Sequence, residues 1–395
     1  MQRLSWLLIF LWMVWMILPG TVYAEGEGNQ GNSVTNEIIR SQLNQLQVEE
    51  VESFWQYLQN EYGRFFQQKN LPSLFDLLLS EKWSMKEVLA ALGRYLFHEV
   101  IYNGKILGTI IVLAVFCMIL QTLQTAFEQN QVSKVAYAIV FMVIIILAVD
   151  SFYIAVDSAK QAIQHMVDFM LALIPLMLTL LGTMGNFGSV TLFHPLIIFM
   201  IHMIGTIIYL FIFPLFFLST ILSIVSSLSE KYKVNQLAGL LKKIGITLLG
   251  GMLTIFLGVL SIQGVTAAVT DGVTIRTAKY ITGNFVPVVG RTISEAADTV
   301  VSASLLVKNT IGLAGVIILL LISAFPAIKI LSLAFIYQFS AAIMQPMGNS
   351  PIIESLSTIG KTFVYIFAAL ATVGLMFFLA VSIIIASGNI SMMMR

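Results

Sequence analysis

The stretch LFHPLIIFMIHMIGTIIYLFIFPLFFLSTILSIVSSL, residues 192–228, decides the fold class of this chain. It contains no Asp, Glu, Lys or Arg. A helix needs about 20 apolar residues to cross the ~30 Å hydrocarbon core of a bilayer, so this stretch is long enough to span a membrane. The whole chain of 395 residues is 58% hydrophobic and 10% charged, with a mean hydropathy of +0.91. These values exclude a soluble globular enzyme, in which about 25% of residues are charged.

Other apolar runs along the chain also have the length of membrane spans. They are residues 106–127, 135–153, 244–262, 311–344 and 363–386, with a shorter run at 166–184. We therefore predict an all-α polytopic membrane protein with six to eight transmembrane helices, whose multi-span domain covers residues 105–395.

The N-terminus has the features of a cleavable signal peptide. Arg3 precedes an apolar run of about 15 residues, and a Pro-Gly pair follows. In Val22-Tyr23-Ala24, small residues occupy the two positions that a signal peptidase reads. We expect residues 1–24 to be removed, because the apolar run is shorter than a transmembrane helix. An uncleaved anchor is the alternative, and it would also export the residues that follow.

Residues 25–104 form a polar segment with eleven acidic and six basic side chains. Apolar residues recur at helical spacing in 34–46 and 48–66, and Pro72 opens a shorter helix at 73–79. The sequence Ser84-Met85-Lys86-Glu87 is a capping box that begins a helix through Tyr102. We predict a small helical extracytoplasmic domain, which is either self-contained or docked on a partner or on the membrane helices.

Pairs of prolines suggest an internal repeat in the membrane region. Pro175 and Pro214 are 39 residues apart, as are Pro287 and Pro326, and the two pairs are offset by 112 residues. A hairpin of two spans is therefore predicted three times, in units 104–156, 192–264 and 309–386. Two connectors, 157–191 and 265–308, join these units.

The connectors decide on which side of the membrane the basic loops lie. If each connector starts and ends on the exported side, with residues 166–184 dipping into the membrane and returning near Gly182 to Gly188, then the basic loops all face the cytoplasm, as the positive-inside rule requires. These loops carry Lys134, Lys231, Lys233, Lys242, Lys243 and Lys361. If residues 166–184 instead form a seventh span, the lysines at 231–243 are exported. We also expect Pro175 and Pro287 to break helices at matched places in the two connectors.

Few residues in this sequence are candidates for a catalytic, ligand-binding or metal-binding role. Asp150, Asp157 and Lys329 are ionisable residues within or beside apolar runs, where charged groups usually face a cavity or a partner. We take these three and the four prolines as candidate structural or assembly residues. The His pair 194 and 202 lies about 12 Å apart along a helix, too far to share an ion. We predict no catalytic, cofactor-binding or metal site.

Motif spacing, cysteine content and net charge argue against several functional classes. The segment Ser355 to Thr362 ends in Gly-Lys-Thr but lacks the first glycine of a phosphate loop. The single Cys117 excludes an intramolecular disulfide. A net charge of +1 without a basic stripe argues against a nucleic-acid partner. We therefore expect a non-enzymatic protein whose surroundings are the lipid bilayer.

The overall pattern resembles the stage III sporulation protein AE family of endospore-forming bacteria. The passages behind the resemblance are Asn284-Phe285-Val286-Pro287-Val288-Val289-Gly290, the helix at 294–304, and Ala172-Leu173-Ile174-Pro175. The resemblance implies a multi-pass subunit of a channel apparatus in the mother-cell membrane, needed for late forespore gene expression. Its implied partners are an ATPase, ring-forming membrane proteins and a forespore membrane partner. The alternative is an autonomous secondary transporter, which the repeats favour and the shortage of polar residues in the spans disfavours.

The predicted sidedness can be tested with single cysteines in a Cys117→Ala background. We expect Asn235→Cys to be shielded from an impermeant thiol reagent on protoplasts and Ala297→Cys to be labelled, because the lysine-rich loop is predicted to be cytoplasmic and the connector exported. Labelling of Asn235→Cys from outside would restore the seven-span count.

Overall fold

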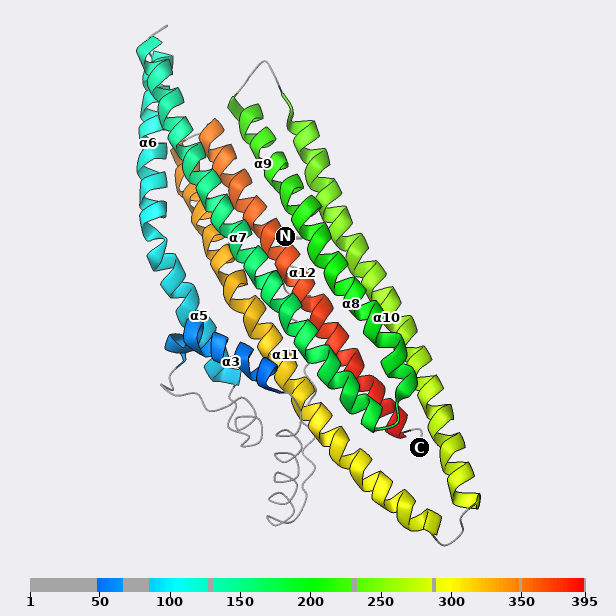
Figure 1. Cartoon of the computed structure of the whole chain (residues 1–395). Helices are drawn as coiled ribbons and strands as arrows, with labels where there is room; N and C mark the ends of the chain where they lie inside the picture. The colour runs from blue at the N-terminus through cyan, green and yellow to red at the C-terminus, as the bar shows by residue number, and fades with distance from the viewer. Residues whose placement is uncertain are drawn as a thin grey trace. The chain divides into compact units, whose positions relative to one another are not determined.

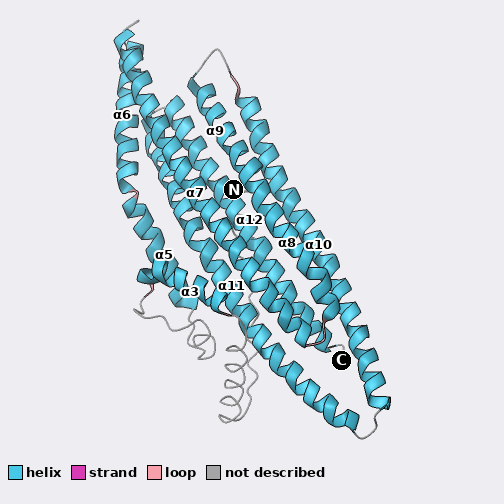
Figure 2. Ribbon diagram, viewed as in Figure 1, coloured by secondary structure: helices cyan, strands magenta, loops and turns pink. Residues whose placement is uncertain are grey.

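The computed structural model describes residues 48–66, 85–126, 131–228, 233–285, 289–347 and 350–393. All regular secondary structure in these residues is helical, as Figure 2 shows. The all-α prediction is confirmed there. The predicted signal peptide and the predicted helices at 34–46 and 73–79 lie outside the described residues.

Long helices make up most of the described chain. They are α6 (Gly104–Ala126), α7 (Gln131–Thr183), α8 (Phe187–Ile207), α9 (Phe213–Leu228), α10 (Asn235–Phe285), α11 (Val289–Met344) and α12 (Pro351–Met393). A π-helical turn, Ile208–Ile212, joins α8 to α9, and the short 3₁₀ turn Gln345–Met347 follows α11. The N-terminal part contributes α3 (Glu49–Tyr62), the 3₁₀ turn Gly63–Phe65 and α5 (Met85–Tyr102).

The long helices run alternately up and down a bundle (Figure 1). One end of the bundle holds the connections α6–α7, α9–α10 and α11–α12, and the other holds α7–α8 and α10–α11. The starts of α7, α10 and α12 therefore lie at one end, and with them the segments that carry Lys134, Lys242 and Lys361. The prediction of three membrane hairpins requires that these lysines lie at the same end of the bundle.

By length and composition, five of the described helices could cross a membrane. They are Val135–Thr183, Pro195–Ser227, Asn235–Gln263, Val301–Met344 and Pro351–Ser387. A sixth is obtained if α5 and α6, which meet at a bend of 42°, count as one span. The expected range of six to eight thus agrees with the structure only at its lower limit, because the apolar run 166–184 belongs to the same helix as the run 135–153.

The predicted helix break at Pro175 is wrong. Helix α7 continues through Pro175 to Thr183. Leu173 and Met177, on either side of Pro175, are buried against Gly315 and Gly312 of α11. A helix break at this point would lose one of these contacts, so packing outweighs the proline penalty of about 3 kcal/mol.

Pro214 and Pro326, which the 112-residue offset matches with each other, have different local surroundings. Pro214 follows the π-helical turn that separates α8 from α9, whereas Pro326 lies inside the uninterrupted α11. A π-helical turn shifts the hydrogen-bond ladder, and this accommodates the donor that Pro214 lacks. Pro287 lies outside the described residues, between α10 and α11. Pro214 and Pro326 thus differ in local helix geometry, and the predicted internal repeat stays a prediction.

The predicted connectors are continuations of the long helices rather than separate segments. Helices α7, α10 and α11 have 53, 51 and 56 residues. At 1.5 Å per residue each is about 80 Å long, and even a tilt of about 40° leaves roughly 60 Å across a hydrocarbon core of ~30 Å. Part of each helix must therefore lie beyond the hydrocarbon core.

Close approach of α11 to α12 organises the packing of the bundle. A Cβ atom built on Gly360 would lie 2.6 Å from the Gln338 Cγ and 3.1 Å from the backbone nitrogen of the same residue. Hydroxyl pairs tie α12 to α9, with the Oγ1 atoms of Thr220 and Thr362 2.7 Å apart. Tyr337 of α11 donates from its hydroxyl to Ser151 Oγ of α7 at 2.8 Å. Small residues and hydroxyls are the usual means of close helix packing in membranes.

We expect Gly360→Val to destabilise the bundle by about 1–3 kcal/mol, because the new side chain meets the backbone of α11. Thermal unfolding in detergent measures the effect. The matched control is Gly250→Val, since a Cβ at Gly250 meets nothing within 4 Å. Equal melting temperatures for the two variants would contradict the close α11–α12 contact.

Candidate functional site

The N-terminal helices α3 and α5 pack on the bundle. Phe54 of α3 meets Phe169 of α7 edge to face, with ring centroids 5.2 Å apart. Tyr62 stacks on Phe325 of α11, with centroids 4.0 Å apart and planes at 2°. Of the alternatives left open by the sequence, docking on the membrane helices is the one the structure contains.

Phe325 is the centre of this interface and is fully buried. Besides Tyr62, it meets Tyr95 of α5 edge to face at 5.2 Å and Phe66 at 6.3 Å. Aromatic pairs of this kind contribute about 0.5–1.5 kcal/mol each beyond the area they bury. Three pairs around one ring therefore fix α3 and α5 at a defined height on α11.

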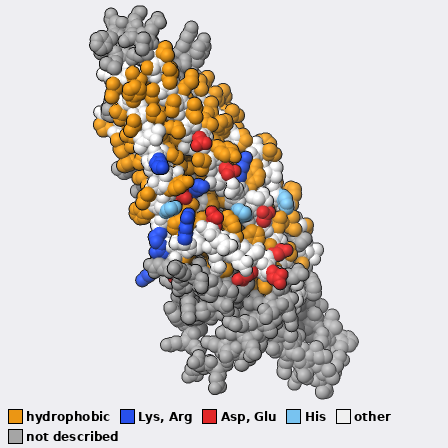
Figure 3. Space-filling model, turned by 60° about the vertical axis from the view of Figure 1, so that its left-hand side comes forward, with side chains coloured by type: hydrophobic (Ala, Val, Ile, Leu, Met, Phe, Trp, Pro, Cys, Tyr) orange, Lys and Arg blue, Asp and Glu red, His pale blue; other side chains and the backbone are white. Residues whose placement is uncertain are grey.

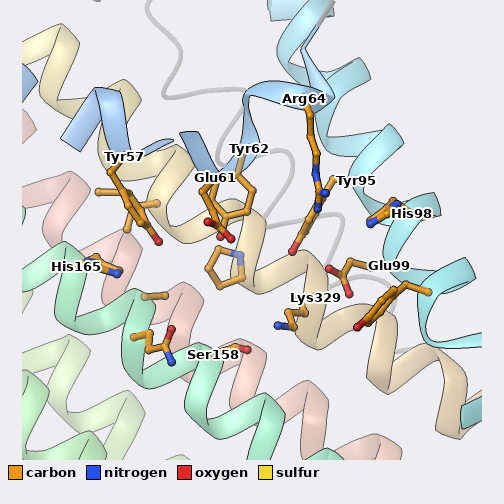
Figure 4. A pocket seen from close by; sticks show the side chains of 15 residues that line it. Tyr57, Glu61, Tyr62, Arg64, Tyr95, His98, Glu99, Ser158, His165 and Lys329 are labelled. Atoms are coloured by element: carbon orange, nitrogen blue, oxygen red, sulfur yellow. The ribbon is translucent and has the colours of Figure 1, made fainter. Parts of the chain in front are cut away.

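A cavity of about 490 Å³ opens beside the aromatic cluster, between α3, α5, α7 and α11 (Figure 4). Its volume falls within the range of small-molecule sites, roughly 300–1,000 Å³. The lining residues are Tyr57, Glu61, Tyr62, Arg64, Tyr95, His98, Glu99, Tyr102, Ser158, Gln161, Ala162, His165, Ile322, Pro326 and Lys329.

Charged groups of both signs face the cavity. Glu61 and Glu99 come from α3 and α5, and Lys329 comes from α11. Glu99 is buried, and its Oε2 accepts a hydrogen bond from Asn103 Nδ2 at 3.1 Å. The Arg64 guanidinium lies over the Phe65 ring, 4.8 Å from its centroid.

The tyrosines on the α3 side of the cavity remain protonated at neutral pH. Burial, and then the negative charge of Glu61, raises the pKa of Tyr57 above its usual value. Burial also raises the pKa of Tyr62, and the neighbouring Tyr57 and Glu61 add to the effect. The two phenol groups also share a side-chain hydrogen bond with each other.

The cavity contains two of the four histidines. The His165 ring lies 4.7 Å from the Tyr57 ring, and His98 lies 5.3 Å from Phe65. In the part of the chain that the structure describes, no three His, Cys, Asp or Glu side chains are placed to hold a metal ion. Both histidines make ring contacts within the aromatic surroundings.

The structure separates the candidate residues named from the sequence. Lys329 and Pro326 line the cavity, one helical turn apart on α11. Asp157 accepts a hydrogen bond from Gln161 Nε2 at 2.7 Å beside the cavity, and Asp150 is exposed further along α7. Neither Pro175 nor Pro214 is among the lining residues. On the face shown in Figure 3, charged side chains and histidines gather in a middle band, while the upper part is mostly hydrophobic.

Lys308 is a buried cation that the sequence analysis missed. It has no exposed surface, and its Nζ donates to the backbone oxygen of Ile385 at 2.8 Å and to Asn389 Oδ1 at 3.2 Å. Both acceptors are neutral and belong to α12. The lysine lies just before the apolar run 311–344 in the sequence. Because residues 265–308 were predicted to be a connector between membrane hairpins, Lys308 was not expected to be buried.

These features define a multi-pass helical membrane protein with a polar cavity at the junction of its N-terminal helices and its bundle. The family described as Stage III sporulation protein AE matches residues 70–388. A protein of Bacillus subtilis (strain 168) named "Stage III sporulation protein AE" is 51% identical over 399 residues, which cover 100% of both chains. No solved structure matches the chain.

The chain therefore belongs to the stage III sporulation protein AE family. The match covers most of the membrane domain and reaches into the N-terminal helices, so the family resemblance seen in the sequence is confirmed. With its apolar helices, this makes the chain a multi-pass membrane protein of sporulation.

We expect Lys308→Met to fold about as stably as the parent, because removing a buried charge that has only neutral partners also removes its desolvation cost. Lys308→Ala leaves a void and should cost about 2–5 kcal/mol. Thermal unfolding in detergent compares the two variants. Equal, large losses for both would show instead that the hydrogen bonds of the amine hold α12 on α11.

Proposed function

We propose that the chain is a non-enzymatic, integral subunit of the sporulation channel complex that links the mother cell and the forespore. Its partners in this complex are an ATPase, ring-forming membrane proteins and a forespore membrane partner, and the complex sustains late forespore gene expression. The observation that carries the proposal is membership of the stage III sporulation protein AE family along most of the chain.

The lengths of the helices support a role in assembly. Helices of about 80 Å extend well past a ~30 Å hydrocarbon core, so the bundle offers protein surface outside the lipid. The docked helices α3 and α5 enlarge this surface. A subunit that joins other proteins across an intermembrane space needs such a surface.

The proposed orientation follows from charge. Residues 1–24 act as a signal peptide, and residues 25–104 lie outside the cytoplasm. The bundle end with the connections α6–α7, α9–α10 and α11–α12 faces the cytoplasm, because lysines cluster near it. The protein then resides in the mother-cell membrane with its N-terminal helices toward the forespore.

An autonomous secondary transporter is the second candidate function. One observation favours it: the polar cavity beside α11, which contains charged groups of both signs. Ionisable groups in a cavity between the helices of a membrane protein are common features of transporter sites. A transporter of this kind functions without a fixed set of partners.

Affinity purification from sporulating cells distinguishes the two candidates. With a tag on the C-terminus and a mild detergent extract, we expect the ATPase and the ring-forming subunits to co-elute with the chain, because a channel subunit holds its partners through protein contacts. Mass spectrometry identifies the eluted proteins.

Vegetative cells that express the same tagged chain provide the control for non-specific capture. An unrelated tagged multi-pass protein in sporulating cells is the second control. Elution of the chain alone from sporulating cells, at a yield equal to that from vegetative cells, would overturn the channel-subunit proposal in favour of the transporter.

A further inference from the structure

Three lysines lie at one level of the bundle, on two neighbouring helices. Lys242 and Lys243 of α10 directly precede the apolar run 244–262. On α12, Lys361 comes just before the apolar run 363–386. Both helices begin at the same end of the bundle (Figure 1), and they pack against each other. The change from polar to apolar sequence marks the boundary between lipid headgroups and hydrocarbon, so the three ammonium groups are placed at the level of the headgroups.

The Tyr365 ring brings cations of both helices together. The Lys242 Nζ lies 5.7 Å from the centroid of this ring, so an ammonium of α10 is stabilised over an aromatic face of α12. Tyr365 is one helical turn beyond Lys361, on the same side of α12. Phe216 of α9 packs on the Tyr365 ring, with centroids 5.7 Å apart, and holds it in place. Lys361 is exposed and Lys242 is half-buried, so both cations remain accessible at the edge of the α10–α12 contact.

The described helices leave this positive charge without a counter-charge. Helix α9 contains no Asp or Glu, and neither does α10 between residues 235 and 262. The acidic residue of α12, Glu354, precedes Lys361 by seven residues, about 10 Å along the helix. Among the residues that the structure describes, none forms an ion pair with Lys242, Lys243 or Lys361. The three lysines are therefore available to an anionic ligand.

Exposed apolar side chains continue from the lysines toward the middle of the membrane. Ile246, one turn beyond Lys242, is 41% exposed, and Val364, which follows Lys361, is 37% exposed. Only 28% of the apolar part of the α10 span is buried, the lowest share among the five candidate spans of the described chain. An anionic head with apolar tails fits both features. An acidic peptide would match the lysines but leave the apolar side chains without a counterpart.

We propose that the edge of the α10–α12 contact binds an anionic phospholipid, with its phosphate between Lys242 and Lys361 and its acyl chains along Ile246 and Val364. Basic pockets between membrane helices at headgroup level are suited to anionic lipids. A zwitterionic lipid carries its own cation beside the phosphate and gains less from the two lysines. The proposal does not depend on the channel partners.

The test uses the full chain purified in detergent, with thermal unfolding measured after addition of phosphatidylglycerol or phosphatidylcholine at equal mole fractions. We expect phosphatidylglycerol to raise the melting temperature by about 2–4 °C more than phosphatidylcholine does, because a ligand that binds only the folded state stabilises it. A higher salt concentration should reduce this difference, since salt screens exposed charges. Inorganic phosphate should have no effect, because it lacks the acyl chains.

Variants locate the effect at the two helices. Lys242→Gln and Lys361→Gln should each reduce the difference between the lipids by about half, and the double variant should abolish it, because each lysine contributes one charge contact. Lys105→Gln is the matched control. Lys105 is also exposed and also precedes an apolar run, but it lies on α6, outside the α10–α12 contact. This variant should respond as the parent does.

Three results would overturn the proposal. The first is equal stabilisation by the two lipids, and the second is a preference for phosphatidylglycerol that survives in the double variant. The third is an equal shift with inorganic phosphate, which would show a simple anion site. A double variant that keeps the lipid preference but recovers fewer partners from sporulating cells would assign the lysines to an acidic protein instead. The lipid measurement uses the purified chain alone, so failure of this proposal and failure of the channel-subunit proposal can be told apart.

Discussion

The arrangement of this molecule depends on the close contact between α11 and α12. At Gly360 the two helices approach until no side chain fits between them, and at Gly312 and Gly315 α11 leaves room for side chains of α12 and α7. In a bilayer, moving an apolar side chain from lipid into the protein interior gives little favourable free energy, because lipid tails are equally apolar. Helix association therefore depends on this kind of close packing. The contact fixes the height and rotation of α11. The aromatic interface and the cavity both lie on that helix or against it.

Helix α11 carries two kinds of surface because of this constraint. Gly312, Gly315 and the fully buried Tyr337 face the bundle, whereas Phe325, Pro326 and Lys329 meet the N-terminal helices. Helices α3 and α5 are held on α11 by the aromatic rings around Phe325, and α3 also contacts α7 through Phe54 and Phe169. A rotation of α11 would move the Lys329 side of the cavity and the Phe325 interface together. Helix α11 thus couples the N-terminal helices to the bundle, together with the contact of α3 with α7.

The sequence predicts this fold in part, and the reasons for the misses are physical. Apolar run length gave the membrane helices and the all-α class, and helical spacing gave α3 and α5, because both signals are local. The break at Pro175 failed because the contacts of Leu173 and Met177 with α11 are tertiary and outweigh a local preference. The cavity could not be predicted at all, since its walls come from four separate stretches of the chain, residues 57–64, 95–102, 158–165 and 322–329. Only Lys329 and Pro326 among them stood out, as a charge and a proline in an apolar run.

Lys329 shows why the polar N-terminal segment is part of the membrane protein rather than an appendage. A lysine at the centre of a lipid-exposed helix costs about 2.5–3.5 kcal/mol or more, a cost usually reduced by extension of the side chain to the membrane surface. Here α3 and α5 bring Glu61, Glu99 and four tyrosines to the same cavity, so the ammonium meets polar walls instead of lipid. The charge and the helices that surround it therefore stabilise each other. A substitution of Lys329 should therefore weaken the docking of α3 and α5 more than it weakens the packing of the bundle.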